Sequence, residues 1–196
     1  MSADRSPSIE RIEALVRRAQ RGETAAFEAL YDRFYDKVFR YLSFKTGDAL
    51  LAEDLSEEVF LRMLTSIGSY EHRGHPFSSW LFRIAHNLAV DHFRKQGRQK
   101  TVSLEKVSAV VGESGVDLDR YVQTKLTMRE VNRAMEGLTD LQRQVISMRF
   151  AGELSVKETA EALGRKENAI KALQHAGIKK LRRILMPAGS PSHQHI

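Results

Sequence analysis

One face of a helix predicted near the C-terminus groups the side chains best suited to chemistry. At 100° per residue, that face carries Asn168, Lys171, Ala172, His175, Lys179 and Arg182. It holds three cations, an amide and an imidazole, and no acid. An amide and a lysine near a helix start can hydrogen-bond base edges, whereas Lys179 and Arg182 suit phosphates. The pattern therefore predicts non-covalent recognition of duplex DNA.

Two short helices must position this face. Ser155 followed by Glu158 forms a capping box, so a helix is predicted to begin near Val156. Gly164 ends that helix and a second one follows. The inward stripe of the second helix is Ile170, Leu173, Gly177, Leu181 and Ile184. Such a pair is typical of a helix-turn-helix, whose second helix enters the major groove. Charge alone would favour a solvated basic face on an ordinary small bundle, but the spacing favours DNA contact.

An acidic helix in the N-terminal half is a second candidate site. Residues 46–60 contain no Lys or Arg, although the chain carries a net charge of +6. The acids there are Asp48, Glu53, Asp54, Glu57 and Glu58, and Leu51, Leu55 and Phe60 lie among them. A mixed acidic and apolar face suits docking to a basic protein helix. A solvated acidic face explains the same residues equally well.

The segment FSSWLFRIAHNLAVDHFRK, residues 77–95, is a third candidate. If this segment is helical, one 80° sector of the helix carries the only Trp of the chain together with polar side chains: Trp80, Ile84, Asn87, Asp91 and Arg94. Aromatic rings beside hydrogen-bonding groups suit unstacked bases. Alternatively, Trp80 belongs to the core and the three polar residues form a network within the helix.

The composition excludes several classes of site. The chain has no cysteine, so disulfides, thiol nucleophiles and cysteine-based zinc sites are excluded. We expect no metal, no cofactor, no catalytic residue and therefore no enzyme, because no suitable motif occurs. No apolar run is long enough for membrane insertion, and the start lacks a signal-peptide centre. These features fit a cytoplasmic protein.

Helical periodicity dominates the chain and predicts an all-α fold. The predicted helices are Ile9–Arg21, Thr24–Lys45, Asp48–Ile67, Phe77–Lys95 and a further one around Leu118–Gly137, before the helix-turn-helix. We expect two helical domains, residues 8–96 and 118–186, joined by a flexible linker, residues 97–117, which several glycines interrupt. The tail, residues 187–196, is expected to be disordered. The free protein should then sample many inter-domain arrangements.

Taken together, these segments resemble a bacterial RNA polymerase sigma factor of the extracytoplasmic-function (ECF) type. The stretch AEDLSEEVFLRML is similar to the subregion that docks on polymerase, and FSSWLFRIAHNLAVDHFRK to the segment that melts and reads the −10 element. LTDLQRQVISMRF and LSVKETAEALGRKENAIKALQHAGIKKLRR are similar to the domain that reads the −35 element. The resemblance covers about residues 20–185, and the order of the motifs makes it specific.

The resemblance implies roles for individual residues. The polymerase-docking residues would be Asp54, Glu57, Glu58 and Phe60. The −10 DNA-binding residues would be Trp80, Asn87, Asp91 and Arg94, and the loop 66–76 would capture a flipped base. The helix-turn-helix face would read the −35 element. The implied partners are core RNA polymerase (its β′ clamp helices and β flap), promoter DNA and an anti-sigma factor.

One departure from the family pattern lies late in the recognition helix. Many relatives have an Arg-Ala pair where this chain has Ala176 and Gly177. The sequence also leaves other functions open. A dimeric helix-turn-helix regulator that acts without polymerase would need neither the acidic helix nor the Trp80 face. A helical adaptor without DNA function would not need the basic face.

Overall fold

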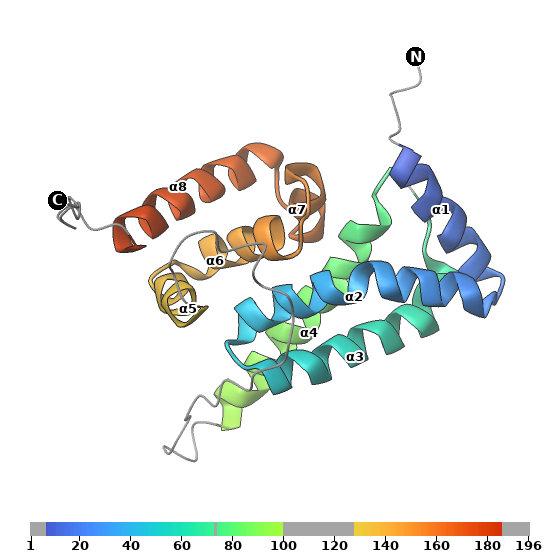
Figure 1. Ribbon diagram of the computed structural model, residues 1–196, viewed down its shortest axis with the longest axis horizontal. Helices are drawn as coiled ribbons and strands as arrows, with labels where there is room; N and C mark the ends of the chain where they lie inside the picture. The colour runs from blue at the N-terminus through green and yellow to red at the C-terminus, as the bar shows by residue number, and fades with distance from the viewer. Residues whose placement is uncertain (1–6, 73, 100–127, 186–196) are drawn as a thin grey trace, which may run out of the picture.

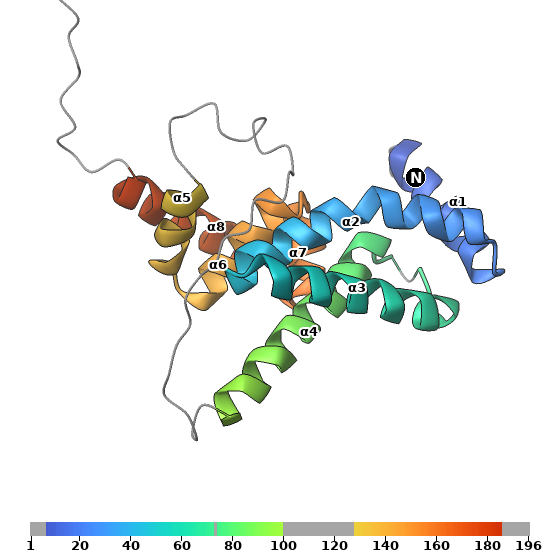
Figure 2. The ribbon, with the colours of Figure 1, turned by 60° about the horizontal axis from the view of Figure 1, so that its bottom comes forward.

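The computed structural model describes residues 7–72, 74–99 and 128–185, and these ranges contain helices and no strand. Two groups of helices lie side by side in both ribbon views (Figure 1, Figure 2). The first group comprises α1 (Pro7–Gln20), α2 (Thr24–Thr46), α3 (Ala49–Ser66), the short 3-10 turn η1 (Ile67–Ser69) and α4 (Phe77–Gln99). The second comprises α5 (Met128–Glu136), α6 (Asp140–Ile146), the π-helical turn η3 (Ser147–Ala151), α7 (Val156–Ala162) and α8 (Glu167–Leu185). The predicted all-α, two-domain architecture is confirmed.

The first domain is built on a tight connection between α2 and α3. Gly47 ends α2 with a φ of 72°, a conformation that glycine adopts without strain. Asp48 then caps α3, where its side chain accepts hydrogen bonds from the backbone N–H groups of Leu50 (3.0 Å) and Leu51 (3.2 Å). The largest fully buried side chains of this domain are Leu30, Val38, Tyr41, Leu42, Val59, Met63, Leu81 and Phe82. This core fixes α3 and α4, the two helices that carry candidate sites.

The second domain holds the predicted helix-turn-helix. The capping box of Ser155 and Glu158 is present, so α7 begins at Val156 as predicted. Gly164 has a φ of 62° in the turn before α8. Val145, Ala160 and Ile170 pack together and hold α6, α7 and α8 in place. The hydrophobic core here is small, as expected for a short domain.

The close packing of α8 against α6 explains the glycine at position 177, in the middle of α8. It is buried, and a Cβ added there would lie 3.0 Å from Cγ1 of Ile146. Glycine therefore lets α8 approach α6 more closely than alanine would. Helix packing thus accounts for Gly177, whereas nothing in the structure explains the exposed Ala176.

Helix boundaries match the sequence predictions closely, with one difference. α4 continues to Gln99, so the first residues of the predicted linker are helical. Helical interiors tolerate a residue such as Gly97 at a cost of about 1 kcal/mol relative to Ala. The rest of the linker, residues 118–127 of the next predicted helix and the tail lie outside the described residues.

The two domains are in direct contact. Met148, Leu154 and Ala162 of the second domain belong to the same buried cluster as the core of the first. Gly152 lies so close to Phe82 that an added Cβ would be 2.5 Å from its ring. The structure shows one arrangement of the two domains, and the variety of inter-domain arrangements in the free protein stays a prediction.

Candidate nucleic-acid interface

The predicted DNA-reading face of α8 is exposed. All six predicted residues, Asn168, Lys171, Ala172, His175, Lys179 and Arg182, lie on the solvent side of the helix. On the opposite side, Ile170 and Gly177 are buried, and Leu173 and Leu181 are half-buried. The structure therefore brings together the whole predicted set on one accessible basic surface.

Arg149, which the sequence analysis missed, anchors α8 from behind. Its Nε donates a 2.8 Å hydrogen bond to Oε1 of Gln174, and its guanidinium also donates to the carbonyl of Leu154. One side chain thus ties the turn before α7 to the middle of α8. Arg149 lies in η3, before the helix-turn-helix begins, and no spacing within that motif indicates this role.

The surroundings of Trp80 on α4 agree in part with each of the two interpretations of its helix face. Its ring is half-buried, with centroid distances of 5.2 Å to Tyr70 and 5.4 Å to Phe77. Asp91 and Arg94 form an ion pair of 3.1 Å within the helix, while Asn87 is exposed. The interpretation of Trp80 as a core residue beside a polar network within the helix is therefore correct in part. Asn87 and Arg94 stay accessible to a ligand.

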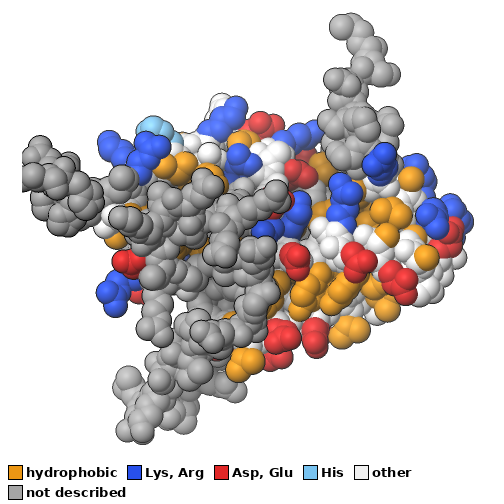
Figure 3. Space-filling view, in the orientation of Figure 1, with side chains coloured by type: hydrophobic (Ala, Val, Ile, Leu, Met, Phe, Trp, Pro, Cys, Tyr) orange, Lys and Arg blue, Asp and Glu red, His pale blue; other side chains and the backbone are white. Residues whose placement is uncertain are grey.

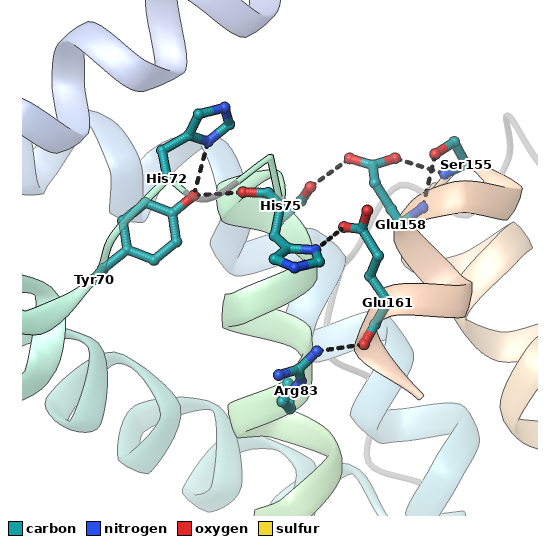
Figure 4. A network of polar contacts seen from close by, with 8 residues as sticks. Tyr70, His72, His75, Arg83, Ser155, Glu158 and Glu161 are labelled. Atoms are coloured by element: carbon teal, nitrogen blue, oxygen red, sulfur yellow. Dashed lines mark hydrogen bonds and ion pairs between the residues drawn. The ribbon is translucent and has the colours of Figure 1, made fainter. Parts of the chain in front are cut away.

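The loop before α4 is held in a defined shape by its own polar groups. The hydroxyl of Tyr70 donates a 2.8 Å hydrogen bond to the carbonyl of His75 and lies 3.3 Å from Nδ1 of His72 (Figure 4). Burial, helped by the charges of Glu13 and Glu161, raises the pKa of Tyr70 to about 12. The side chain of Gln20 donates to the backbone carbonyl of Tyr70 at 2.7 Å. The hydroxyl therefore stays protonated and continues to donate near neutral pH.

The acidic surface of α3 differs from the prediction in its apolar part. Asp54 and Glu57 are exposed, and Glu58 pairs with Arg62 at 2.8 Å. Phe60 is only 4% exposed, because its ring packs on Tyr31 with a centroid distance of 4.7 Å. Phe60 therefore supports the surface from inside and does not form it.

Leucines that the sequence analysis missed supply the exposed apolar groups. Leu50, Leu61 and Leu64 are 73%, 58% and 54% exposed. Together with two acids they form one stripe at helical spacing, which we call the α3 stripe: Leu50, Asp54, Glu57, Leu61 and Leu64. Figure 3 shows apolar side chains flanked by acidic ones over α2 and α3. The spacing could have identified the stripe from the sequence.

Two tyrosines of α2 border the α3 stripe. The rings of Tyr31 and Tyr35 stack at a centroid distance of 5.0 Å. Partial burial, and then the charge of Glu57, raises the pKa of Tyr31. A surface that combines aromatic faces with carboxylates suits a guanidinium or ammonium group from a partner.

The described ranges hold neither a cluster of metal-ligating side chains nor a helix suited to span a membrane. Within them, no group of three or more His, Cys, Asp or Glu side chains could hold a metal ion. None of the helices in those ranges is long and apolar enough to cross a membrane.

Family models match both domains. The model described as Sigma-70 region 2 matches residues 30–99, and the model described as Sigma-70, region 4 matches residues 134–183. The first range contains the α3 stripe and α4, and the second contains the helix-turn-helix.

Curated relatives extend the similarity over most of the chain. ECF RNA polymerase sigma factor SigX of Bacillus subtilis is 34% identical over 160 residues, covering 80% of this chain and 82% of SigX. ECF RNA polymerase sigma factor BldN of Streptomyces coelicolor is 38% identical over 176 residues, covering 89% of this chain and 66% of BldN.

The fold is shared with a solved sigma factor. The sigma factor RpoE, in complex with the anti-sigma factor NepR from Bartonella quintana, superposes with a TM-score of 0.67 at 20% identity. That match covers 83% of this chain and 98% of RpoE.

Proposed function

This chain belongs to the family of ECF RNA polymerase sigma factors, and we propose how its surfaces divide the work of promoter recognition. The protein is a transcription initiation factor that makes core RNA polymerase specific for a promoter. It binds the −35 element through α8 and the −10 element through α4 and the loop before it. It docks on polymerase through the α3 stripe. The protein itself catalyses no reaction, and it works in the cytoplasm, where polymerase and DNA are.

The observation that carries this proposal is the exposed basic face of α8. Asn168 and Lys171 stand near the start of the helix, where a recognition helix meets base edges. Lys179 and Arg182 follow further along, where phosphates of the groove wall are within reach. In this proposal Asn168 and Lys171 contact base edges and read the sequence. Lys179 and Arg182 contact the phosphates of the DNA backbone.

The −10 element is read where bases leave the duplex. The half-buried ring of Trp80 closes one side of the loop 66–76, and Asn87 and Arg94 lie further along the same face of α4. Unpaired bases stack on aromatic rings and expose edges for hydrogen bonds. Capture of such bases stabilises the melted form of the promoter.

The α3 stripe suits a basic, partly apolar helix such as the β′ clamp helices that the family resemblance implies. Its three leucines offer apolar surface, and Asp54 and Glu57 select a positively charged partner. The β flap and an anti-sigma factor complete the set of partners in this proposal.

A dimeric regulator that acts without polymerase is the alternative. The α3 stripe favours the polymerase-bound function, because two copies that paired through it would bring the exposed Asp54 and Glu57 of one against the like charges of the other. Run-off transcription from a genomic library with reconstituted polymerase tests the proposal. We expect transcription from a small set of promoters only when the protein is added. Unchanged transcription, together with specific duplex binding by the protein alone, would establish the regulator.

A further inference from the structure

Helix α1 lies against η1, the turn that follows α3 (Figure 1). The match to Sigma-70 region 2 covers residues 30–99, so α1 lies before it. Val16 and Ala19 of α1 are nevertheless buried with the core of the first domain. Because this packing fixes α1, its side chains Glu13 and Gln20 reach the loop before α4 from a defined position.

The side chain of Gln20 holds both ends of η1. Its Nε2 donates hydrogen bonds of 3.0 Å to the carbonyl of Ile67 and 2.7 Å to the carbonyl of Tyr70. Both partners are acceptors, so the amide must present its nitrogen, and both of its hydrogens are used. The backbone N–H of Tyr70 also donates to the carbonyl of Ile67 at 3.1 Å. One side chain of α1 thus fixes the turn with which the loop begins.

Glu13 contacts the same loop further along the chain. Its Oε1 lies 3.0 Å from Nε2 of His72, and its side chain is only 13% exposed. The other ring nitrogen of His72 lies 3.3 Å from the hydroxyl of Tyr70, which donates a 2.8 Å hydrogen bond to the carbonyl of His75 (Figure 4). The contacts of α1 therefore continue through His72 and Tyr70 to the residues just before α4.

Tyr70 connects these contacts with Trp80. Its ring centroid lies 5.2 Å from that of Trp80 and 5.5 Å from that of Phe77, which it meets edge-on. Tyr70 is buried, whereas Gly68 and Ser69 on the outer side of the loop are exposed. A loop that is held from inside and open on its outer side loses little conformational entropy when a ligand arrives.

We propose that α1 positions the loop before α4 for base capture, an inference that rests on the proposed function. Gln20 and Glu13 hold the capture loop, residues 67–72 and 74–76, in the shape that receives an unpaired base beside Trp80. Neither side chain contacts the base, and both act through the loop as positioning residues. Without them the loop must be ordered when the promoter melts, and the cost of that ordering weakens capture. Duplex recognition through α8 does not use the loop and keeps its strength.

The first test uses holoenzyme and a fork junction, which is promoter DNA with a duplex −35 element and an unpaired non-template −10 strand. The promoter is one identified by run-off transcription. Each base of the unpaired strand is removed in turn to leave an abasic site. The position at which removal weakens binding by the unsubstituted holoenzyme most is the captured base.

Gln20→Met keeps the length of the side chain and removes both donors. It should weaken binding to the intact fork about fivefold to tenfold, as expected for the loss of two hydrogen bonds. On the fork that lacks the captured base, the same substitution should change binding less than about twofold, because no base is left to position. Glu13→Gln should show the same pattern with a smaller loss.

Val59→Ala is the matched control for a loss of stability. Val59 is fully buried within α3, so its truncation weakens the first domain and should affect the two forks equally. Equal losses on the two forks with Gln20→Met, or no loss on the intact fork, would overturn the inference. If no abasic site weakened binding by the unsubstituted holoenzyme, the proposed reading of the −10 element would fail, and this inference with it.

The second test measures amide hydrogen exchange in the free protein. The backbone N–H of Tyr70 is held by its hydrogen bond across η1. Gln20→Met and Glu13→Gln should each speed its exchange at least about fivefold and leave the middle of α3 unchanged. Val59→Ala should instead speed exchange within α3. Unchanged exchange at Tyr70 in both α1 variants would contradict positioning by α1, whatever the DNA measurement gives.

Discussion

At the scale of single residues, the environment of His86 makes stability depend on pH. Its Nδ1 lies 3.3 Å from the hydroxyl of the buried Tyr41. Burial, and then the charge of Lys45, lowers the pKa of His86 from 6.5. The folded state therefore favours the neutral ring, and the unfolded chain binds the proton more readily.

The sign of the pH effect follows directly. Well above pH 6.5 the ring is neutral in both states, and its contribution to stability is complete. As pH falls below 6.5, the unfolded state gains protons first, so the free energy of unfolding decreases. Urea unfolding at pH 7.5 and 5.5 should show a smaller decrease for His86→Gln than for the unsubstituted protein. The exposed His175 provides the control, since His175→Gln should leave the decrease unchanged.

The face of α8 can also be tested residue by residue. Lys171→Ala should cost about 1–3 kcal/mol on the preferred −35 sequence and relax the preference at one position. Lys179→Ala should weaken binding evenly across sequences and reduce the salt slope by about 1. Holoenzyme binding to a library of −35 variants at several salt concentrations measures both effects. A changed motif with Lys179→Ala would contradict the division between base and phosphate contacts.

At the scale of helices, sequence patterns predicted local structure well and contacts between distant segments poorly. The α7 cap and the basic face of α8 follow from spacing within a few residues, so the sequence revealed them. The ion pair between Glu153 and Arg40 joins residues more than a hundred positions apart, and no local pattern encodes such a pair. The family resemblance implies Phe60 as a docking residue, but helix packing turns its ring inward.

The close approach of α6 and α8 gives a prediction about packing. Gly177→Ala gains about 1 kcal/mol of helix propensity but places a Cβ 3.0 Å from Cγ1 and 3.3 Å from Cδ1 of Ile146. Ile146→Val removes the second of these contacts. The alanine should therefore be more favourable when it is combined with Ile146→Val, with a coupling of about 0.5–1 kcal/mol in a double-mutant cycle. Additive effects would show that Gly177 is not needed for the approach.

The α3 stripe gives a prediction about association. Asp54→Lys with Glu57→Lys reverses two exposed charges, so it should abolish co-purification with core polymerase while circular dichroism shows an intact fold. Glu130→Lys with Glu136→Lys on α5 makes the same change in net charge elsewhere and should leave binding intact. Normal co-purification of the α3 variant would exclude the stripe as the docking surface.

At the scale of the whole molecule, the two DNA-reading domains can bind one promoter together only when a partner holds them apart. The structure has them in contact, with α7 against the −10 region. A polymerase surface that binds both domains would separate them and raise the effective concentration of the second once the first is bound. Free protein and holoenzyme should therefore differ sharply in DNA binding.

Gel shifts on duplex promoter DNA, with and without core polymerase at equal salt, test this claim most directly. The promoter is one identified by run-off transcription, and a scrambled duplex measures the non-specific background. We predict weak, poorly specific binding by the free protein and tight, specific binding by the holoenzyme. Nanomolar, sequence-specific binding by the protein alone would contradict the account.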